Sequence, residues 1–162
     1  MKYEIEALVA QYSERLLRYA TSIMYDYHEA EDIVQDVFMT AHAKMATFDG
    51  ENLSAWLYKI TYHKCLNRLK RRKVLPFAEV PIPEIMTVAD NGLSETTLRT
   101  LAKLKPQERA LLYGRIIEEY SYDELALQMG MSAATIRKRY ERTKKKFIEL
   151  SGGSNEFGEL DR

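Results

Sequence analysis

The sequence predicts an all-α protein of two small helical domains joined by a flexible linker. In both halves the apolar residues recur at the three- and four-residue spacing of an amphipathic helix, and no segment shows the alternation typical of a strand. Three of the four prolines fall within residues 74–95, a stretch without helical period. We therefore expect domains over residues 1–73 and 94–150, a linker over 74–93 and a flexible tail over 151–162.

The composition excludes several classes of function. No apolar run approaches the ~20 residues that span a bilayer, and the first residues contain no apolar signal segment. The single cysteine cannot form an internal disulfide, and the three histidines are too scattered for a metal site. There is no glycine-rich phosphate loop and no nucleophile elbow. We expect a cytoplasmic protein that is not an enzyme and holds no metal or cofactor.

Charge is distributed in blocks along the chain. The 24 Lys and Arg balance the 24 Asp and Glu, yet seven basic residues fall within 59–73 with no carboxylate, and seven more within 137–146 with one Glu. Residues 19–43 carry five carboxylates and no Lys or Arg. Such segregation predicts separate surfaces for different partners.

The first domain is predicted to contain an amphipathic helix over residues 30–45. Its apolar positions are expected in the core and are Ala30, Ile33, Val34, Val37, Phe38, Ala41 and Met45. The opposite face has net negative charge and carries Glu31, Asp32, Gln35, Asp36 and Met39. The break TFDGEN follows, with Gly50 as its pivot, and a further helix is expected to begin near Ser54 as its N-cap.

That further helix is predicted to have one packing arc and one cationic arc. Tyr58, Tyr62, Cys65, Leu66 and Leu69 share the packing arc. The opposite arc carries Lys64, Asn67, Arg68 and Arg71. A solvated charged face is the simpler interpretation, but such faces usually mix both signs, and this one has no carboxylate. Asn67 among cations also suits bidentate contact with a base edge, so the predicted partner is a polyanion.

The second domain carries the pattern of a helix-turn-helix. Ser121 and Glu124 form a capping box at the start of a short helix. Gly130 supplies the left-handed turn that ends this helix, and Ser132 caps the next one. Small and apolar residues stand at the relative spacing that two closely crossing helices require. The pattern is fairly specific for a helix-turn-helix, although a helical hairpin that binds another protein remains an alternative.

Two shorter helices are predicted before this motif. Ser94 is a suitable N-cap, and Pro106 a suitable first residue because a missing N–H costs nothing there. Gly114 interrupts the helical stretch LLYGRIIEE at a cost of ~1 kcal/mol relative to Ala, and room for close packing is the reason that the sequence suggests.

The second helix of the motif has a predictable core face and outward face. Ile136, Tyr140, Thr143 and Phe147 are expected in the core. The outward face carries Ala134, Arg137, Lys138, Glu141, Arg142 and Lys145. Short side chains at the start of this helix allow a close approach to a DNA groove, and the cations can reach guanine edges or phosphates.

Together these segments resemble the extracytoplasmic-function (ECF) sigma factors, the smallest initiation factors of bacterial RNA polymerase. The resemblance rests on AEDIVQDVF, then TFDGENLSAWLYKITYHKCLNRLKRRK, and finally LKPQERALLYGRIIEEYSYDELALQMGMSAATIRKRYERTKKKF, in this order over roughly residues 5–150. It implies a factor that binds core RNA polymerase and directs promoter-specific initiation by recognising −10 and −35 elements and helping to melt DNA.

The resemblance also implies a role for each surface. The clamp helices of the largest polymerase subunit would bind Asp32, Gln35, Asp36 and Met39, and the flap of the second-largest subunit is a further implied contact. The −10 element would be held by Phe48, Asp49, Gly50, Asn52, Trp56, Lys64, Asn67, Arg68, Arg71 and Arg72. The −35 element would be read by Ser132, Ala134, Thr135, Arg137, Lys138, Glu141, Arg142 and Lys145. The acidic linker would thread toward the RNA exit path, and an anti-sigma factor is a possible further partner.

Two other functions are weighed against this one. A stand-alone helix-turn-helix regulator would bind duplex DNA without polymerase, and it would need neither the acidic helix face nor the loop over residues 48–52. A metal-dependent nuclease could use Glu29, Asp32 and Asp36, although no further metal ligand is indicated. Trp56 has two interpretations as well, since it could stack on a freed base or simply belong to the core.

Overall fold

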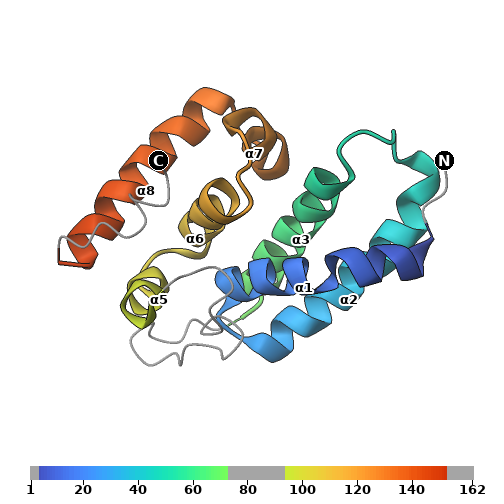
Figure 1. The fold of residues 1–162 in the computed structure, drawn as a ribbon, viewed down its shortest axis with the longest axis horizontal. Helices are drawn as coiled ribbons and strands as arrows, with labels where there is room; N and C mark the ends of the chain where they lie inside the picture. The colour runs from blue at the N-terminus through green and yellow to red at the C-terminus, as the bar shows by residue number, and fades with distance from the viewer. Residues whose placement is uncertain (1–3, 73–93, 153–162) are drawn as a thin grey trace.

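The computed structural model describes residues 4–72 and 94–152 of the chain (Figure 1). Every regular element within these ranges is a helix, which confirms the predicted fold class. The helices are α1 (Ile5–Met24), α2 (Tyr27–Lys44), η1 (Met45–Thr47), α3 (Leu53–Lys70), α5 (Glu95–Ala102), α6 (Pro106–Leu112), η4 (Tyr113–Ile117), α7 (Tyr122–Met129) and α8 (Ala133–Leu150). The expected linker over 74–93 and residues 153–162 of the expected tail lie outside the described residues. None of the helices in the described ranges is long and apolar enough to cross a bilayer.

Helices α1, α2 and α3 form the first bundle, in which each helix packs against the other two. The apolar stripe predicted for α2 is buried from Ala30 to Ala41, and Met45 is half-buried just beyond the helix. On α3, Tyr58, Tyr62 and Cys65 are buried, while Leu66 and Leu69 are partly buried against the same core. The predicted packing arcs of α2 and α3 are therefore confirmed.

The start of α3 differs from the prediction. Asn52, not Ser54, is the N-cap, and its side chain accepts a hydrogen bond of 3.1 Å from the backbone N–H of Ala55. Asn52 has a φ of 45°, in the left-handed region that Asn tolerates better than most residues. Ser54 lies inside the helix, and its hydroxyl is 2.5 Å from the hydroxyl of Tyr120 in the second half of the chain. The hydroxyl of Ser54, which was predicted to cap the helix, makes a long-range contact instead.

Helices α5 to α8 form the second bundle and contain the predicted helix-turn-helix. The capping box is present, because Ser121 Oγ accepts from the Glu124 N–H at 3.1 Å and Glu124 Oε1 accepts from the Ser121 N–H at 3.0 Å. Gly130 ends α7 with a φ of 69°, and Ser132 caps α8. The predicted core face of α8, Ile136, Tyr140, Thr143 and Phe147, is buried. Ser94 is the N-cap of α5 and Pro106 is the first residue of α6, as predicted.

Gly114 allows α7 to approach the segment that follows α6. It lies in the π-helical turn η4, and a Cβ added to it would be 2.8 Å from Leu125 Cδ2 on α7. Leu125 is fully buried, so it has little room to move away. Helix propensity disfavours Gly114, and close packing against Leu125 is the reason that a glycine is required there.

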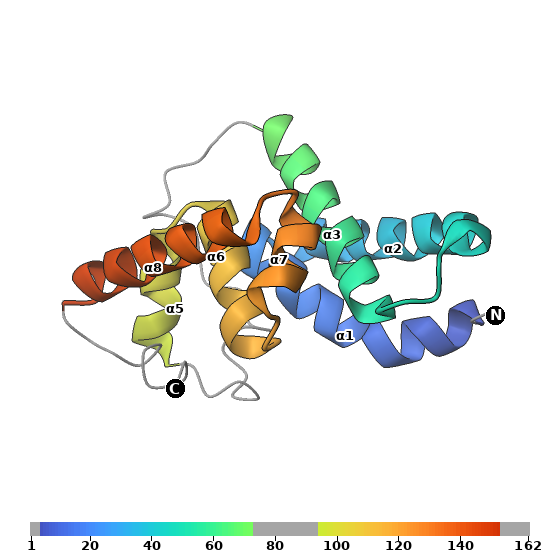
Figure 2. The same cartoon turned by 90° about the horizontal axis from the view of Figure 1, so that it is seen from above.

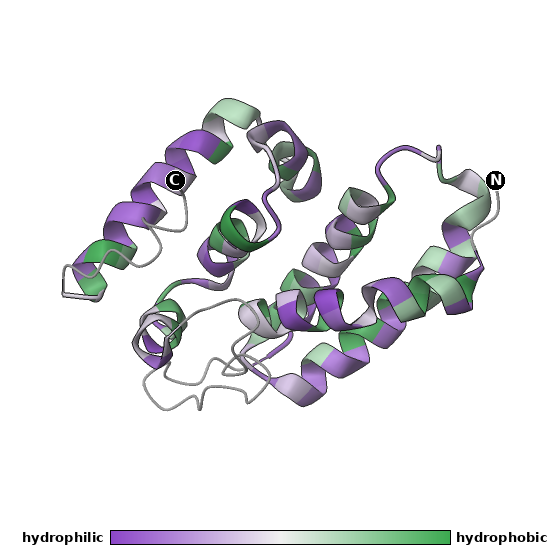
Figure 3. Cartoon of the chain, in the orientation of Figure 1, coloured by the Kyte–Doolittle hydropathy of each residue, from purple (hydrophilic) through white to green (hydrophobic). Residues whose placement is uncertain are grey.

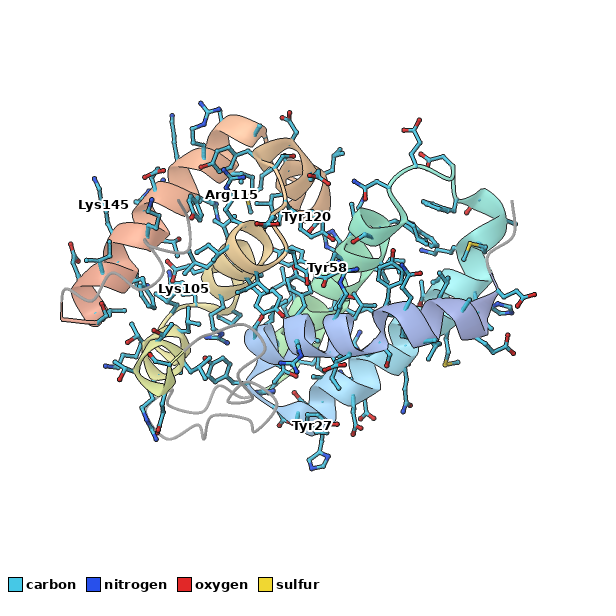
Figure 4. The ribbon with its side chains drawn as sticks, in the orientation of Figure 1. Tyr27, Tyr58, Lys105, Arg115, Tyr120 and Lys145 are labelled. Carbon is cyan, nitrogen blue, oxygen red and sulfur yellow. The ribbon has the colours of Figure 1, made fainter. Side chains whose placement is uncertain are left out.

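The two bundles lie against each other and share one hydrophobic core (Figures 1 and 2). Helix α3 packs on α7, and α1 packs on α6 and η4. The contact is rich in tyrosine: the ring of Tyr58 lies 5.3 Å from that of Tyr120, and the ring of Tyr19 lies 5.7 Å from that of Tyr113. Figure 4 shows Tyr58 and Tyr120 where the bundles meet. The sequence did not indicate this arrangement.

Candidate polymerase and promoter surfaces

A groove of ≈ 470 Å³ lies between α1 and α2 on the first bundle. Its lining is largely apolar and consists of Val9, Ser13, Leu17, Glu31, Val34, Gln35, Phe38 and Met39. Two of these apolar side chains are unusually exposed, Met39 at 71% and Val9 at 38%. An exposed apolar patch with a polar rim is typical of a protein-docking site.

The four residues predicted to contact polymerase are all exposed on α2, but they divide between two edges of the helix. Gln35 and Met39 line the groove. Asp36 faces α3 instead, with its Oδ2 4.0 Å from Nη2 of Arg68, and Asp32 lies one turn before it. Helix α1 supplies the other wall of the groove, which no pattern within α2 could indicate.

The acidic helix α2 also contacts the end of α3. Arg72 donates a hydrogen bond to Glu29, so two cations of the predicted −10 surface, Arg68 and Arg72, face carboxylates of α2. The charge blocks of the sequence are thus adjacent along this edge. In the part of the chain that the structure describes, no three His, Cys, Asp or Glu side chains gather into a possible metal site.

The loop before α3 presents two stacked aromatic rings. The rings of Phe48 and Trp56 lie 4.4 Å apart with an interplanar angle of 17°, and both side chains are half-buried. Asp49 accepts a hydrogen bond of 2.9 Å from the N–H of Glu51, and Gly50 has a φ of 85°. The turn therefore holds its shape through local contacts and carries an aromatic pair at its base.

Helix α7 of the second bundle borders this loop. The loop, the start of α3 and α7 line an open pocket of ≈ 340 Å³, formed by Thr47, Phe48, Asp49, Glu51, Asn52, Ala55, Trp56, Lys59, Glu124, Leu127 and Gln128. Asn52 Nδ2 donates to Glu124 Oε2 at 2.9 Å. Burial opposes the ionisation of Glu124, but hydrogen bonds from Ser121 and Asn52 outweigh it and hold its pKa below the usual value. The sequence did not indicate the contribution of α7, because Asn52 and Glu124 are more than 70 positions apart along the chain.

The predicted cationic arc of α3 is only partly exposed to solvent. Asn67 and Arg71 are exposed, whereas Lys64 and Arg68 are half-buried. The exposed side chains lie on the surface opposite the buried Tyr58, Tyr62 and Cys65, as the helical spacing predicted.

The outward face of α8 is hydrophilic along most of its length, as Figure 3 shows. Exposed residues on it are Ala134, Arg137, Lys138, Glu141, Arg142 and Lys145. The hydroxyls of Ser132 and Thr135 are engaged in the cap at the start of α8. The Ser132 hydroxyl accepts a hydrogen bond from the Thr135 N–H at 3.1 Å and contacts Thr135 Oγ1 at 2.9 Å. Lys145 points away from the molecule in Figure 4.

One contact on this face was not anticipated from the sequence. The Arg137 guanidinium lies 5.4 Å from the centre of the Tyr122 ring, and the Arg115 guanidinium lies 4.3 Å from the same ring. At an exposed site a cation–π contact contributes roughly 0.5–1 kcal/mol. Tyr122 therefore helps to orient Arg137 at the start of the outward face of α8.

Two family models match the chain: Sigma-70 region 2 over residues 8–74 and Sigma-70, region 4 over residues 94–147. RNA polymerase sigma factor YlaC of Bacillus subtilis is 30% identical over 169 residues, which cover 98% of this chain and 96% of that protein. ECF RNA polymerase sigma factor SigM of Mycobacterium tuberculosis is 28% identical over 159 residues, which cover 95% of this chain and 80% of SigM.

Solved structures share the fold. The sigma factor RpoE from Bartonella quintana, in complex with the anti-sigma factor NepR, has a TM-score of 0.73 at 24% identity and covers 90% of this chain and 94% of its own. CnrH, in complex with the cytosolic domain of CnrY, has a TM-score of 0.69 at 26% identity and covers 93% of this chain and 88% of its own.

A helix-turn-helix bundle joined to a three-helix bundle is an architecture typical of a DNA-binding protein. The chain belongs to the ECF sigma factors of the sigma-70 family. It acts with core RNA polymerase on promoter DNA in promoter-specific transcription initiation.

Proposed function

We propose that the groove between α1 and α2 binds the clamp helices of core RNA polymerase, while α3 with its preceding loop binds the −10 element and α8 reads the −35 element. The observation that carries this proposal is the groove with its exposed Met39. A stand-alone helix-turn-helix regulator needs no protein-docking surface of this kind on its other bundle.

In the polymerase contact, apolar and charged residues have different tasks. Met39 and Val9 bring exposed apolar area that a partner helix can bury, at roughly 25 cal/mol per Å². Gln35 borders the same groove and can hydrogen-bond to the partner. Asp32 and Asp36 lie toward the other edge of α2, where exposed charges contribute mainly to encounter rate and specificity.

The −10 surface combines stacking and phosphate contacts. Unstacking a promoter base costs a few kcal/mol, and stacking on an aromatic side chain returns ~1–3 kcal/mol. The Phe48–Trp56 pair is the proposed stacking site. Asn67 and Arg71 are the exposed polar contacts on α3, and the binding energy from phosphates falls with salt. Asp49, Gly50, Asn52, Lys64, Arg68 and Arg72 complete the proposed surface.

The −35 surface is the outward face of α8. Ala134 leaves room for the approach to the major groove, and Arg137 and Lys138 are the proposed contacts to base edges or phosphates. Glu141, Arg142 and Lys145 extend the surface along the helix. Ser132 and Thr135, whose hydroxyls contact each other at the cap, are proposed to act mainly through the geometry of the helix start.

The experiment that tests the proposal is transcription in vitro from a promoter library with core polymerase, with and without this protein. Met39→Glu places a charge in the groove and should weaken core binding at least ~tenfold, equivalent to ~1.4 kcal/mol. Because Met39 is 71% exposed, the melting temperature should not change. Leu150→Glu is the control, since it adds the same charge at a partly exposed apolar position at the end of α8.

The outcomes separate the initiation factor from the regulator. The proposal is supported if promoter-dependent transcripts appear only with the protein. Met39→Glu should suppress these transcripts, and Leu150→Glu should not. Sequence-specific duplex binding with no transcripts on any template favours the regulator instead. Alanine at Arg137 and Lys138 should weaken −35 protection first, whereas alanine at Lys64 and Arg71 should first reduce opening at −10.

Two finer features follow from this role. We propose that the chain is a specificity factor rather than an enzyme, so that polymerase performs the catalysis, and that it works in the cytoplasm where polymerase is found. CnrH was solved with the cytosolic domain of CnrY, and an anti-sigma factor is a proposed partner of this chain. Co-purification from cells would identify such a partner directly.

A further inference from the structure

The sulfur-bearing side chains of this protein differ sharply in their exposure to solvent. Met39 on α2 is 71% exposed, whereas Cys65 on α3 is fully buried. The other methionines of the described ranges are all less exposed than Met39: Met24 at 1%, Met129 at 7%, and Met45 and Met131, which are half-buried. Among the described residues, Met39 is therefore the sulfur that a dissolved oxidant reaches most easily.

The buried thiol does not compete with Met39 for an oxidant. Thiol oxidation proceeds through the thiolate and requires access to solvent. Burial raises the pKa of Cys65 far above its usual value, so that its thiolate is scarce in the folded chain. A thioether has no proton to lose, and its oxidation depends on access to the sulfur rather than on a pKa. The reactive sulfur of the folded chain is thus a thioether and not a thiol.

The position of Met39 links its oxidation to docking. Its side chain lines the groove between α1 and α2, next to the apolar side chains of Leu17, Val34 and Phe38. Val34 and Phe38 are buried, so they provide a fixed apolar floor, while Met39 offers flexible apolar area to a partner. A partner helix that covers this groove removes the Met39 sulfur from water.

Oxidation changes the polarity of this side chain without a large change in its size. Hydrogen peroxide transfers one oxygen atom to the sulfur: an S–O bond forms, the O–O bond breaks and water leaves. The thioether loses two electrons, which the peroxide gains. The resulting sulfoxide is polar, and its oxygen is a hydrogen-bond acceptor. A polar group that is buried in an apolar contact without a partner weakens that contact.

We propose that Met39 is a reversible oxidation site that controls the binding of core RNA polymerase. Peroxide converts its thioether to the sulfoxide and weakens docking in the groove, and methionine sulfoxide reductases restore it. This inference rests on the proposed function, because it takes the groove as the polymerase contact. The fold is unaffected, since a side chain with most of its surface in water contributes little to the core.

The test begins with the purified full-length chain. It is treated with hydrogen peroxide, the peroxide is removed, and peptide mass spectrometry locates the added oxygen. Met39 should gain oxygen before Met24 and Met129, because these two are buried. Binding to untreated core polymerase should then be about tenfold weaker than before treatment, with an unchanged circular dichroism spectrum. Reductases specific for the two sulfoxide epimers, added together, should restore the affinity.

Two variants show whether the effect belongs to Met39. Met39→Leu keeps an apolar side chain but removes the sulfur, so its affinity for core polymerase should be the same before and after peroxide. Met1 and Met86, which lie outside the described residues, remain in this variant. Adding Leu150→Met to Met39→Leu places a new thioether at a partly exposed position at the end of α8. Its oxidation should leave core binding unchanged, because it lies outside the groove.

The order of reaction gives an independent check. Core polymerase bound before the peroxide is added should slow the oxidation of Met39, because the partner covers its sulfur. An equal loss of affinity after peroxide in wild type and in Met39→Leu overturns the inference, since another side chain would then be responsible. Slower oxidation of Met39 than of Met24 overturns it as well.

The variant Met39→Glu separates this inference from the proposed function. If Met39→Glu weakens core binding while the sulfoxide at the same position does not, the oxidation control is wrong and the groove remains the polymerase contact. If neither Met39→Glu nor the sulfoxide changes core binding, the proposed polymerase contact is itself refuted, and the inference fails with it.

Discussion

Arg68 on α3 lies 4.0 Å from Asp36 on α2, so the cationic arc of α3 and the acidic face of α2 meet along one edge. The side chains are 32% and 54% exposed, and a pair of this kind is worth at most ~1 kcal/mol. Asp36 belongs to the surface proposed for polymerase and Arg68 to the surface proposed for promoter DNA, so the pair joins the two proposed surfaces.

Asp36→Asn should therefore raise promoter affinity. Removal of the carboxylate frees Arg68 for phosphate, and the gain should be at most ~fivefold because exposed pairs are worth at most ~1 kcal/mol. The gain should shrink as salt is added, since the contact is electrostatic. Fluorescence anisotropy with a promoter fragment at two salt concentrations measures it. Asp32→Asn removes the same charge one turn earlier and should give a smaller change; equal gains would mean that Arg68 is not specifically involved.

Gly114→Ala should destabilise the protein despite the better helix propensity of alanine. The added Cβ would lie 2.8 Å from Leu125 Cδ2, and overpacking typically costs ~1–3 kcal/mol, against a propensity gain of ~1 kcal/mol. Urea unfolding followed by circular dichroism measures the net change.

The matching control for Gly114 is a double-mutant cycle with Leu125→Ala. In that background the clash is gone, and Gly114→Ala should stabilise by up to ~1 kcal/mol through helix propensity alone. A loss of stability of the same size in both backgrounds would show that the cost comes from the π-helical turn rather than from Leu125.

The buried tyrosines predict an alkaline limit to stability. Burial, reinforced by Glu118, raises the pKa of Tyr58 and Tyr113 well above 10, and burial likewise raises that of Tyr19. The unfolded chain ionises its phenols near ~10, whereas the native state keeps these three neutral. Stability should thus be unaffected by them below pH ~10 and fall as pH rises above it. Phenolate absorbance and circular dichroism should then change together in one cooperative step; gradual ionisation with intact helices would contradict this.

Cys65 should be unreactive in the native protein. It is fully buried on α3, and burial raises the pKa of its thiol far above the usual value, so the nucleophilic thiolate is scarce. A chromogenic disulfide reagent should react slowly with the folded chain and rapidly in denaturant. Ala43→Cys, exposed on α2, provides a thiol that should react at once in the folded state. Rapid native reaction of Cys65 would mean that the first bundle opens readily.

Local elements were largely predictable from the sequence because their determinants are close along the chain. The capping box of Ser121 and Glu124, the left-handed Gly130 and the Ser132 cap act within a few residues, and all were found as predicted. The apolar stripe of α2 was likewise readable from its spacing. Ser54 failed as a predicted cap because its hydroxyl has a partner on Tyr120, far away in sequence.

The candidate site was predictable only in part. Exposure of Met39 and Arg137 followed from helical periodicity. The α1 wall of the groove, the bond from Asn52 to Glu124 and the contact between Asp36 and Arg68 did not, because each joins different helices. Periodicity says which way a side chain points on its own helix, and it carries no information about the neighbour that it meets.

The amino-acid order by itself determined the helices, their caps, their buried faces and the family to which the chain belongs, since these depend on spacing and on interactions within a few turns. Only the tertiary structure decided that the bundles dock, that Arg109 reaches the end of α1 and that Glu118 bonds to Tyr58. Docking brings together groups many residues apart, and its free energy depends on burial and geometry across the whole interface rather than on any local pattern.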